Sequence, residues 1–264
     1  MTPPGRRTFL EQYAVIRHAE GRGSADRCYY ESLPWKDVTG RNSEQWKIRA
    51  RSYRHFERTI LRAAERESGR ALRILDLGAG NCWMSYRLSL RGHFAVALDI
   101  FIDDLDGLGA RRNFNGPPPP VAADFDALPF ADQTFDLAIF NSSVHYSPDY
   151  RRTLAEARRC LRPSGTLVII DSPVYRLAEH GEQMRAERQA YFERTYGFRS
   201  DALGSIEYLD TRTLAALSNT FGVEWTARRP WYGWRWALRP LRARIRRQRP
   251  PSRFLILSGR FPAR

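Results

Sequence analysis

Residues 73–83 read Arg73-Ile74-Leu75-Asp76-Leu77-Gly78-Ala79-Gly80-Asn81-Cys82-Trp83. The apolar run at residues 74–77 is typical of a buried parallel strand, and the sequence from Trp83 onward predicts a helix. Gly78 and Gly80 separate the two. Because glycine lets the backbone approach a ligand closely, this order of strand, turn and helix indicates a nucleoside-binding site.

Apolar runs and helical patterns alternate along the chain after this stretch. We expect further strands at residues 94–98, 121–123, 135–140, 166–170, 223–227 and 254–257. We expect helices at residues 83–91, 102–112, 148–161, 176–195 and 211–221, the third of them capped by Ser147. The alternation predicts an α/β fold, a Rossmann-like, doubly wound sheet of seven strands that binds ligands at the carboxyl ends of its strands.

The N-terminal part is expected to cover this sheet. Residues 46–68 have apolar residues at three- and four-residue steps and Gly69 at the position of a C-cap, which predicts a helix; residues 9–19 are a further candidate helix. We therefore divide the chain into an N-terminal helical cap at residues 1–69 and a ligand-binding domain at residues 70–264, with an insertion at residues 228–253.

The composition excludes several classes of protein. No apolar run approaches the roughly 20 residues that span a bilayer, and residues 1–7 lack the apolar segment of a signal peptide. Cys28, Cys82 and Cys160 are too far apart for a zinc site, so we expect reduced thiols and no metal. These features predict a cytoplasmic protein.

Positive charge is concentrated at the C-terminal end. The formal net charge is +14, and residues 228–264 contain twelve arginines with no lysine and no acidic residue. Removing those twelve leaves about +2 for residues 1–227 (43 − 12 − 29).

Polar residues follow five consecutive predicted strands, at the edge of the sheet where ligands bind. They are Asp76, Asp99, Asp124, Asn141 and Asp171. A nicotinamide dinucleotide is disfavoured, because Trp83 stands where its fingerprint needs a third glycine and Asp76 would repel a diphosphate. S-adenosylmethionine has no phosphate and carries an amino group and a sulfonium, which an acidic rim suits.

Three motifs resemble those of the class I S-adenosylmethionine-dependent methyltransferases, in that family's order and within about residues 70–172. Residues 74–80 resemble motif I. Asp124-Phe125-Asp126-Ala127-Leu128-Pro129-Phe130 with Phe135-Asp136-Leu137, and Leu161-Arg162-Pro163-Ser164-Gly165-Thr166-Leu167, are similar to runs of the type 11, small-molecule branch. The family often has a third glycine at the position of Cys82.

The resemblance implies S-adenosylmethionine as cofactor, S-adenosylhomocysteine as product, and a set of binding residues. It places Asp99 at the ribose hydroxyls, Asp124 at the adenine amine and Asp76 near the methionyl amine. The implied cofactor-binding residues are Asp76, Gly78, Ala79, Gly80, Asp99, Ile100, Asp124, Phe125 and Asn141.

Methyl transfer is a displacement that depends mainly on alignment, so a general base is needed only when the acceptor must lose a proton. His145 and Tyr146, just after the fourth strand, are the candidate catalytic residues, with Asp171 behind them; His145 can equally be a packing or substrate-lining residue.

Residues 228–253, which we call the Arg/Trp tract, contain Trp231, Tyr232, Trp234 and Trp236 followed by closely spaced arginines. Three interpretations remain open: a solvated basic loop, a peripheral contact with a membrane, and recognition of an anionic acceptor, nucleic acid included.

We therefore predict a methyltransferase acting on a small-molecule or lipid-like acceptor, which can be anionic. The alternatives are an RNA methyltransferase that uses the basic tract and a non-catalytic S-adenosylmethionine-binding partner protein.

Overall fold

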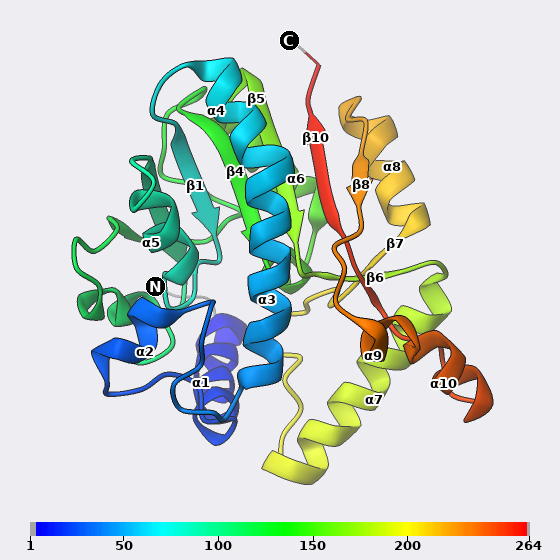
Figure 1. The fold of residues 1–264 in the computed structure, drawn as a ribbon. Helices are drawn as coiled ribbons and strands as arrows, with labels where there is room; N and C mark the ends of the chain where they lie inside the picture. The colour runs from blue at the N-terminus through cyan, green and yellow to red at the C-terminus, as the bar shows by residue number, and fades with distance from the viewer. Residues whose placement is uncertain (1–3, 263–264) are drawn as a thin grey trace.

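The computed structural model describes residues 4–262; residues 1–3, part of the stretch in which no signal peptide is expected, and residues 263–264 lie outside it. Seven strands form one sheet in the order β3-β2-β1-β4-β5-β10-β8 (Figure 1). These strands are β1 (Arg73–Leu77), β2 (Phe94–Asp99), β3 (Pro120–Ala122), β4 (Phe135–Asn141), β5 (Leu161–Ile170), β8 (Thr226–Arg228) and β10 (Ile256–Arg260). The α/β fold with a seven-stranded sheet is confirmed.

Six strands of this sheet run in one direction and β10 runs in the other. β1 to β5 pair in parallel, and β10 is antiparallel to both β5 and β8, so β8 runs parallel to the first five strands. The Arg/Trp tract therefore leaves the sheet at its carboxyl end, where the turns after β1, β2 and β4 also lie.

Helices cover both faces of the sheet, and alternate residues of each strand point to one or the other. Ile74 of β1 belongs to a core shared with α3 (Ser43–Phe56) and α5 (Trp83–Ser89), whereas its neighbour Leu75 packs toward α6 (Tyr150–Cys160) and α8 (Thr211–Phe221). This alternation is why the central strands are apolar at nearly every position.

The N-terminal region is helical, as predicted, and consists of several segments. They are α1 (Pro4–Ala19), α2 (Arg27–Ser32), α3, a π-helical turn (Glu57–Leu61) and α4 (Arg62–Ser68), which ends at Gly69 in the left-handed conformation. The one helix predicted for residues 46–68 is thus interrupted by a π turn. The division into a cap at 1–69 and a domain at 70–264 stays a prediction.

The helix predicted after β2 was wrong in detail. Residues 102–112 were expected to be an α-helix, but only a 3₁₀-helix, Leu108–Asn113, forms there. The Asp103 carboxylate accepts the N–H groups of Leu105 and Asp106 and so competes with a helical turn. A Cβ on Gly107 would lie 2.5 Å from the Asp103 nitrogen, so the loop is tightly closed.

The start of α6 also differs from the prediction. Asp149 is the N-cap and accepts the N–H groups of Arg151 and Arg152, while the Ser147 hydroxyl contacts Thr153 at 2.7 Å. Similarly, β5 begins at Leu161 instead of residue 166, because the strand includes an irregularity at residues 162–165, between the paired positions Leu161 and Thr166.

A small second sheet, absent from the prediction, carries the tract. β6 (Pro173–Tyr175) pairs with β7 (Leu209–Asp210) and with β9 (Arg253–Phe254).

Two strands of the large sheet lie a few residues from their predicted positions: β8 was predicted at residues 223–227 and β10 at residues 254–257. The remaining helices are α7 (Ala178–Tyr196), α9 (Trp234–Ala237) and α10 (Arg239–Ile245). Among the described residues no helix is both long and apolar enough to cross a membrane.

Asp136 at the start of β4 ties three parts of the fold together. Its carboxylate accepts hydrogen bonds from the Arg70 and Arg162 side chains and from the Arg73 backbone N–H at 2.8 Å. Partial burial acts to raise the pKa of Asp136, but these donors lower it below its usual value. The carboxylate therefore stabilises the fold above its unfolded-state pKa, and this contribution is lost as the pH falls.

We expect Asp136→Asn to lower the free energy of unfolding by about 1–3 kcal/mol at pH 7, measured by urea denaturation. The difference from the unsubstituted chain should shrink below about pH 4, where the unfolded carboxylate becomes protonated. Asp104→Asn is the control, because Asp104 makes an exposed ion pair with Arg112 and should matter little. Equal effects of the two substitutions would contradict the assignment.

Candidate active site

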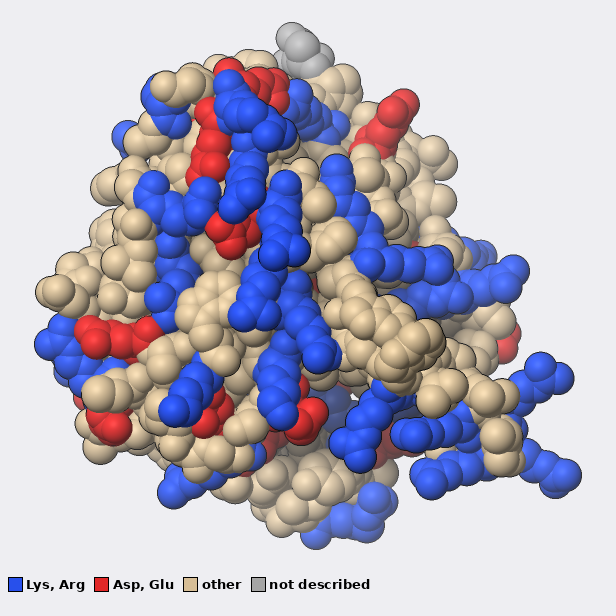
Figure 2. All heavy atoms as spheres, in the orientation of Figure 1, with Lys and Arg blue, Asp and Glu red and all other residues tan. Residues whose placement is uncertain are grey.

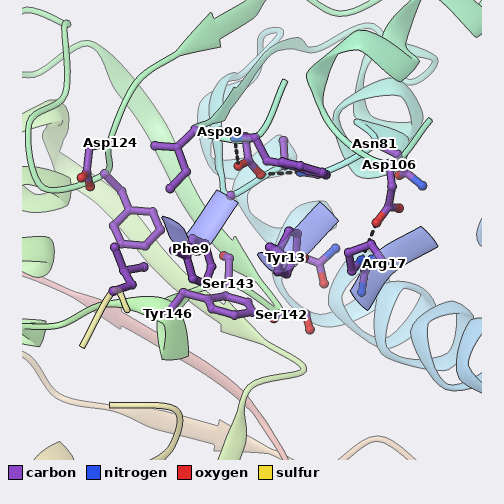
Figure 3. A pocket seen from close by; sticks show the side chains of 18 of the residues that line it. Phe9, Tyr13, Arg17, Asn81, Asp99, Asp106, Asp124, Ser142, Ser143 and Tyr146 are labelled. Atoms are coloured by element: carbon purple, nitrogen blue, oxygen red, sulfur yellow. Dashed lines mark hydrogen bonds and ion pairs between the residues drawn. The ribbon is translucent and has the colours of Figure 1, made fainter. Parts of the chain in front are cut away.

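A cavity of about 280 Å³ lies at the carboxyl ends of β1, β2 and β4, against α1 (Figure 3). Nine residues predicted from the sequence line it: Gly78, Ala79, Gly80, Asp99, Ile100, Asp124, Phe125, Asn141 and Tyr146. Asp76, His145 and Asp171 are not part of its wall. The residues implied for a donor site are therefore gathered around one cavity, although they come from four loops of the chain.

The turn after β1 requires glycine for two reasons. Gly78 and Gly80 have φ values of 75° and 52°, in the left-handed region, and a Cβ on Gly78 would lie only 2.4 Å from the Cβ of Ser143. The Ser143 hydroxyl donates a hydrogen bond to the Leu77 carbonyl, which holds the loop after β4 against this turn. Cys82, at the family's third glycine position, also has a positive φ of 65°.

Asp99 closes the turn from the neighbouring strand. Its two carboxylate oxygens accept the backbone N–H groups of Gly80 and Phe101, each at 2.8 Å. Burial raises the pKa of Asp99, and these hydrogen bonds oppose the increase. A carboxylate has about four acceptor sites, so Asp99 keeps capacity for the two hydroxyls of a ribose.

Asp76 lies behind the glycine turn and is fully buried. Its Oδ2 accepts a hydrogen bond from the Ser85 hydroxyl at 2.7 Å, whereas its Oδ1 has no partner among the described residues. Burial raises the pKa of Asp76 to about 7, and the Ser85 hydrogen bond only partly opposes this. A cation placed nearby would stabilise the charged form and lower that pKa.

The predicted adenine-binding carboxylate already has a partner. Arg6 of α1 makes an ion pair with Asp124 Oδ2, and Asp124 Oδ1 accepts the Asp126 N–H at 2.9 Å. Arg6 lines the cavity and was missed by the sequence reasoning, because residues 1–45 showed no clear organisation.

One face of α1 forms a wall of the cavity. Phe9, Tyr13 and Arg17 are spaced by four residues and all line it (Figure 3). The Tyr13 ring packs edge-on against Tyr146 and Phe101, with centroid distances of 5.8 and 5.1 Å. The four-residue spacing of two aromatic residues and an arginine is the signal in the sequence that could have identified this face, and it was missed.

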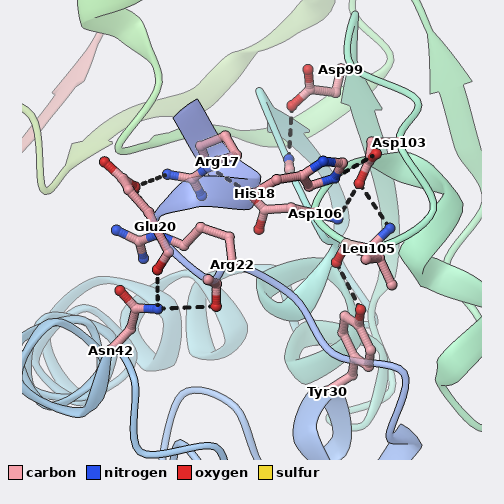
Figure 4. Close-up of polar contacts among 12 residues, drawn as sticks. Arg17, His18, Glu20, Arg22, Tyr30, Asn42, Asp99, Asp103, Leu105 and Asp106 are labelled. Atoms are coloured by element: carbon pink, nitrogen blue, oxygen red, sulfur yellow. Dashed lines mark hydrogen bonds and ion pairs between the residues drawn. The ribbon is translucent and has the colours of Figure 1, made fainter. Parts of the chain in front are cut away.

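Three further arginines line the cavity, and two of them have carboxylate partners. Arg17 pairs with Asp106, and Arg22 pairs with Glu20 at 3.0 Å (Figure 4). Arg49 of α3 contacts the Trp46 ring, 5.2 Å from its centroid, and within the described chain it has no hydrogen bond or ion pair. Burial, together with Arg22 and Arg17, lowers the pKa of Arg49, and the charges of Asp171 and Asp106 partly oppose this. An anion bound in the cavity would complete this arrangement.

The two candidate catalytic residues differ in their surroundings. Tyr146 lines the cavity, whereas His145 is buried behind it with its Nδ1 3.3 Å from the Ser172 hydroxyl. Burial, with Arg188 and Arg49 nearby, lowers the pKa of His145 to about 3. The imidazole is therefore neutral over the physiological range and a weak proton acceptor. Whether either residue acts in catalysis stays a prediction.

Asp171 connects the end of β5 to two distant segments. Its Oδ1 accepts a hydrogen bond from the Ser52 hydroxyl of α3 at 2.5 Å and one from Tyr232 of the Arg/Trp tract at 3.5 Å. Burial raises the pKa of Asp171 to about 6. No residue of the tract lines the cavity, so the tract is attached near the site without forming it.

Comparisons with known proteins agree with this geometry. The sequence profile of a family described as "Methyltransferase domain" matches residues 75–169. The chain is 35% identical over 124 residues to a malonyl-[acyl-carrier protein] O-methyltransferase of Erwinia pyrifoliae, covering 45% of this chain and 46% of that protein. It is 34% identical over 103 residues to a demethylmenaquinone methyltransferase of Mycolicibacterium paratuberculosis, covering 39% and 43%. The chain thus spans about half the length of the curated relatives it matches.

Solved structures show the same fold. An S-adenosylmethionine-dependent methyltransferase of Mesorhizobium loti has a TM-score of 0.52 at 20% identity, covering 72% of this chain and 91% of that one. A 1,6-didemethyltoxoflavin-N1-methyltransferase of Burkholderia thailandensis, solved with 1,6-didemethyltoxoflavin and S-adenosylhomocysteine bound, has a TM-score of 0.52 at 15% identity, covering 99% and 92%.

The glycine turn, the carboxylates around it and the matching profile lead to one conclusion. Residues 75–169 match a methyltransferase-domain family, and the glycine turn and carboxylates of this segment resemble the donor site of class I S-adenosylmethionine-dependent methyltransferases.

Proposed function

We propose that this protein transfers a methyl group from S-adenosylmethionine to a small-molecule or lipid-like acceptor that enters the cavity beside α1. The observation that supports this most is the single cavity that Gly78, Gly80, Asp99, Asp124 and Tyr146 share. The donor half and the aromatic wall are thereby next to each other, and close placement of the reactants is the main requirement of a displacement reaction.

The residues of the donor half fit S-adenosylmethionine, which when bound supplies a methyl group activated by its sulfonium. Asp99 is positioned for the ribose hydroxyls, and Gly78 and Gly80 line the cavity with backbone alone. Asp76, buried behind the glycine turn with an unpartnered Oδ1, would favour the positive amino group through its charge and not by lining the cavity. Arg49, which lines the cavity, suits the methionyl carboxylate.

The acceptor half is largely aromatic. Phe9, Tyr13 and Tyr146 provide flat apolar surfaces, and Trp46 adds another. Such a wall favours an acceptor with an apolar or conjugated body. Of the two candidate catalytic residues, Tyr146 lines the cavity and His145 does not. The Tyr146 hydroxyl is therefore the group that can orient an acceptor hydroxyl or accept its proton.

Two alternative functions remain distinguishable. An RNA methyltransferase would use the Arg/Trp tract to bind its substrate, yet the tract lies outside the cavity wall. A non-catalytic partner protein would bind the cofactor without turnover. Incubation of cell extracts with methyl-labelled S-adenosylmethionine, followed by identification of the labelled product, separates the three: a labelled small molecule or lipid supports our proposal, and labelled RNA or no label contradicts it.

Asp99→Ala should weaken S-adenosylmethionine binding by at least about tenfold, because two ribose hydroxyls lose a charged acceptor. Isothermal titration calorimetry measures this, with thermal unfolding as a check on the fold. Asp104→Ala, at an exposed loop position, is the matched control. NAD should give no binding heat with either chain. Unchanged affinity in Asp99→Ala would refute the ribose assignment.

Donor binding should release a proton at about pH 6, because Asp76 has a pKa of about 7 when no cation is near. The positive amino group and sulfonium lower that pKa, so affinity should increase as the pH is raised toward 7 and change little above about 8. Calorimetry in buffers of different ionisation enthalpy counts the protons. Asp76→Asn should abolish the release; a release that persists would assign it to another group.

Tyr146→Phe should lower kcat by about tenfold or more if the hydroxyl orients the acceptor or accepts its proton, and should leave donor affinity unchanged. The pH dependence of kcat is compared in the two chains. His145→Asn serves as the contrast: its low pKa predicts that no inflection between about pH 5 and 9 depends on it. Equal kcat values for Tyr146→Phe and the unsubstituted enzyme would show that the hydroxyl has no role in catalysis and that the ring only packs.

A further inference from the structure

The outer face of the Arg/Trp tract is apolar and uncovered. α9 and α10 continue one another through Leu238, whose N–H donates to the Trp234 carbonyl and whose carbonyl accepts the Arg242 N–H, both at 3.0 Å. Trp234, Leu238, Leu241 and Ile245 are spaced by four, three and four residues, so they share one side of this helical segment. Their exposed fractions are 76%, 43%, 55% and 72%.

The opposite side of the same segment anchors it to the protein. Tyr232 is buried and its hydroxyl contacts Ser52 at 2.8 Å, and the Trp236 ring packs against Tyr232 and Phe254 with centroid distances of 5.0 and 5.3 Å. Arg249 pairs with Glu187 of α7 at 2.8 Å. These contacts fix the segment against the rest of the protein, and its apolar residues on the other side remain exposed to solvent.

Arginines flank this apolar face. Figure 2 shows Lys and Arg side chains gathered around the tan surface at the lower right, where Figure 1 places α9 and α10. A groove between α10 and α7 is lined by Arg239, Arg242, Arg246, Arg247 and Arg249, with Glu187 as its carboxylate. The tract itself has no acidic residue, so the whole surface is complementary to phosphates.

We propose that the exposed face of residues 231–247 docks this protein onto an anionic lipid surface. Trp234, Leu238, Leu241 and Ile245 enter the interface between headgroups and acyl chains, while the flanking arginines contact lipid phosphates. Nucleic acid is the weaker match, because a continuous apolar face has no counterpart on a phosphate backbone. A solvated loop would not need four large apolar side chains on one side.

The position of this surface suits a lipid-like acceptor. α10 and α1 both lie beyond the carboxyl ends of the strands, the end of the sheet that carries the cavity (Figure 1). Docking through α9 and α10 therefore brings the cavity end toward the lipid. The docking itself does not rest on the proposed methyl transfer, since it needs neither donor nor acceptor.

The test is cosedimentation of the full chain with vesicles. Binding is expected to vesicles that mix phosphatidylglycerol with phosphatidylcholine, and about tenfold weaker binding to phosphatidylcholine alone, with a steep loss as NaCl is raised. The double substitution Leu241→Ser with Ile245→Ser should weaken binding at least about tenfold. Leu90→Ser, at an exposed leucine outside the tract, is its matched control and should bind normally.

The charge contribution is tested separately. Arg242→Ala with Arg246→Ala should weaken binding to the anionic vesicles and leave the residual binding to phosphatidylcholine unchanged. Arg58→Ala with Arg66→Ala, at exposed arginines near the opposite end of the sheet, is the control. Because all four arginines are exposed, thermal unfolding should be the same in every variant.

Three results would overturn the proposal. One is absence of vesicle binding by a chain that still binds S-adenosylmethionine in calorimetry, which leaves the methyltransferase assignment intact. Another is binding to single-stranded RNA that Leu241→Ser with Ile245→Ser does not change, together with no vesicle binding, which makes the tract a nucleic-acid surface. The third is concentration-dependent self-association that the same double substitution abolishes without any lipid binding.

Discussion

The contact between Gly78 and Ser143 is the constraint on which the site depends. It brings the turn after β1 within reach of the loop after β4, at a distance that no residue with a Cβ could allow. The hydrogen bond from Ser143 to the Leu77 carbonyl then joins adjacent strands at the edge where the cavity opens. Asp99 completes the arrangement from the third strand by accepting the Gly80 N–H. Three neighbouring strands are thereby locked together around an opening that the chain does not fill.

The regular part of this arrangement was predictable from the sequence. The apolar run before Gly78 and the acids after β2 and β3 identify strands and their carboxyl ends by local patterns alone, and the cavity contains nine residues expected there. The loop at residues 101–107 was not predictable, since a helical pattern competes there with the hydrogen bonds of Asp103. The hydrogen bonds that the Asp103 carboxylate accepts determine the conformation of this loop.

Residues that reach the cavity from far away in the chain were missed for a different reason. Arg6, Arg17 and Arg49 reach the cavity only after α1 and α3 have packed against the sheet; local spacing shows which residues share a helix face but not what that face packs against. Likewise, His145 looked suitable for proton transfer because it follows β4 by a few residues, yet burial decides its pKa, and burial is a property of the whole fold. The role of a titratable residue was therefore harder to predict than its location.

The ion pair between Arg6 and Asp124 has a consequence for how the cavity is filled. The carboxylate that would recognise an adenine amine is shared with a guanidinium of the N-terminal helix, so an incoming nucleoside competes with a group of the protein itself. The affinity measured for the donor is then a difference between two interactions, and it depends on where α1 rests. In the proposed function, residues near the start of the chain would thus influence nucleoside recognition through how easily Arg6 leaves Asp124.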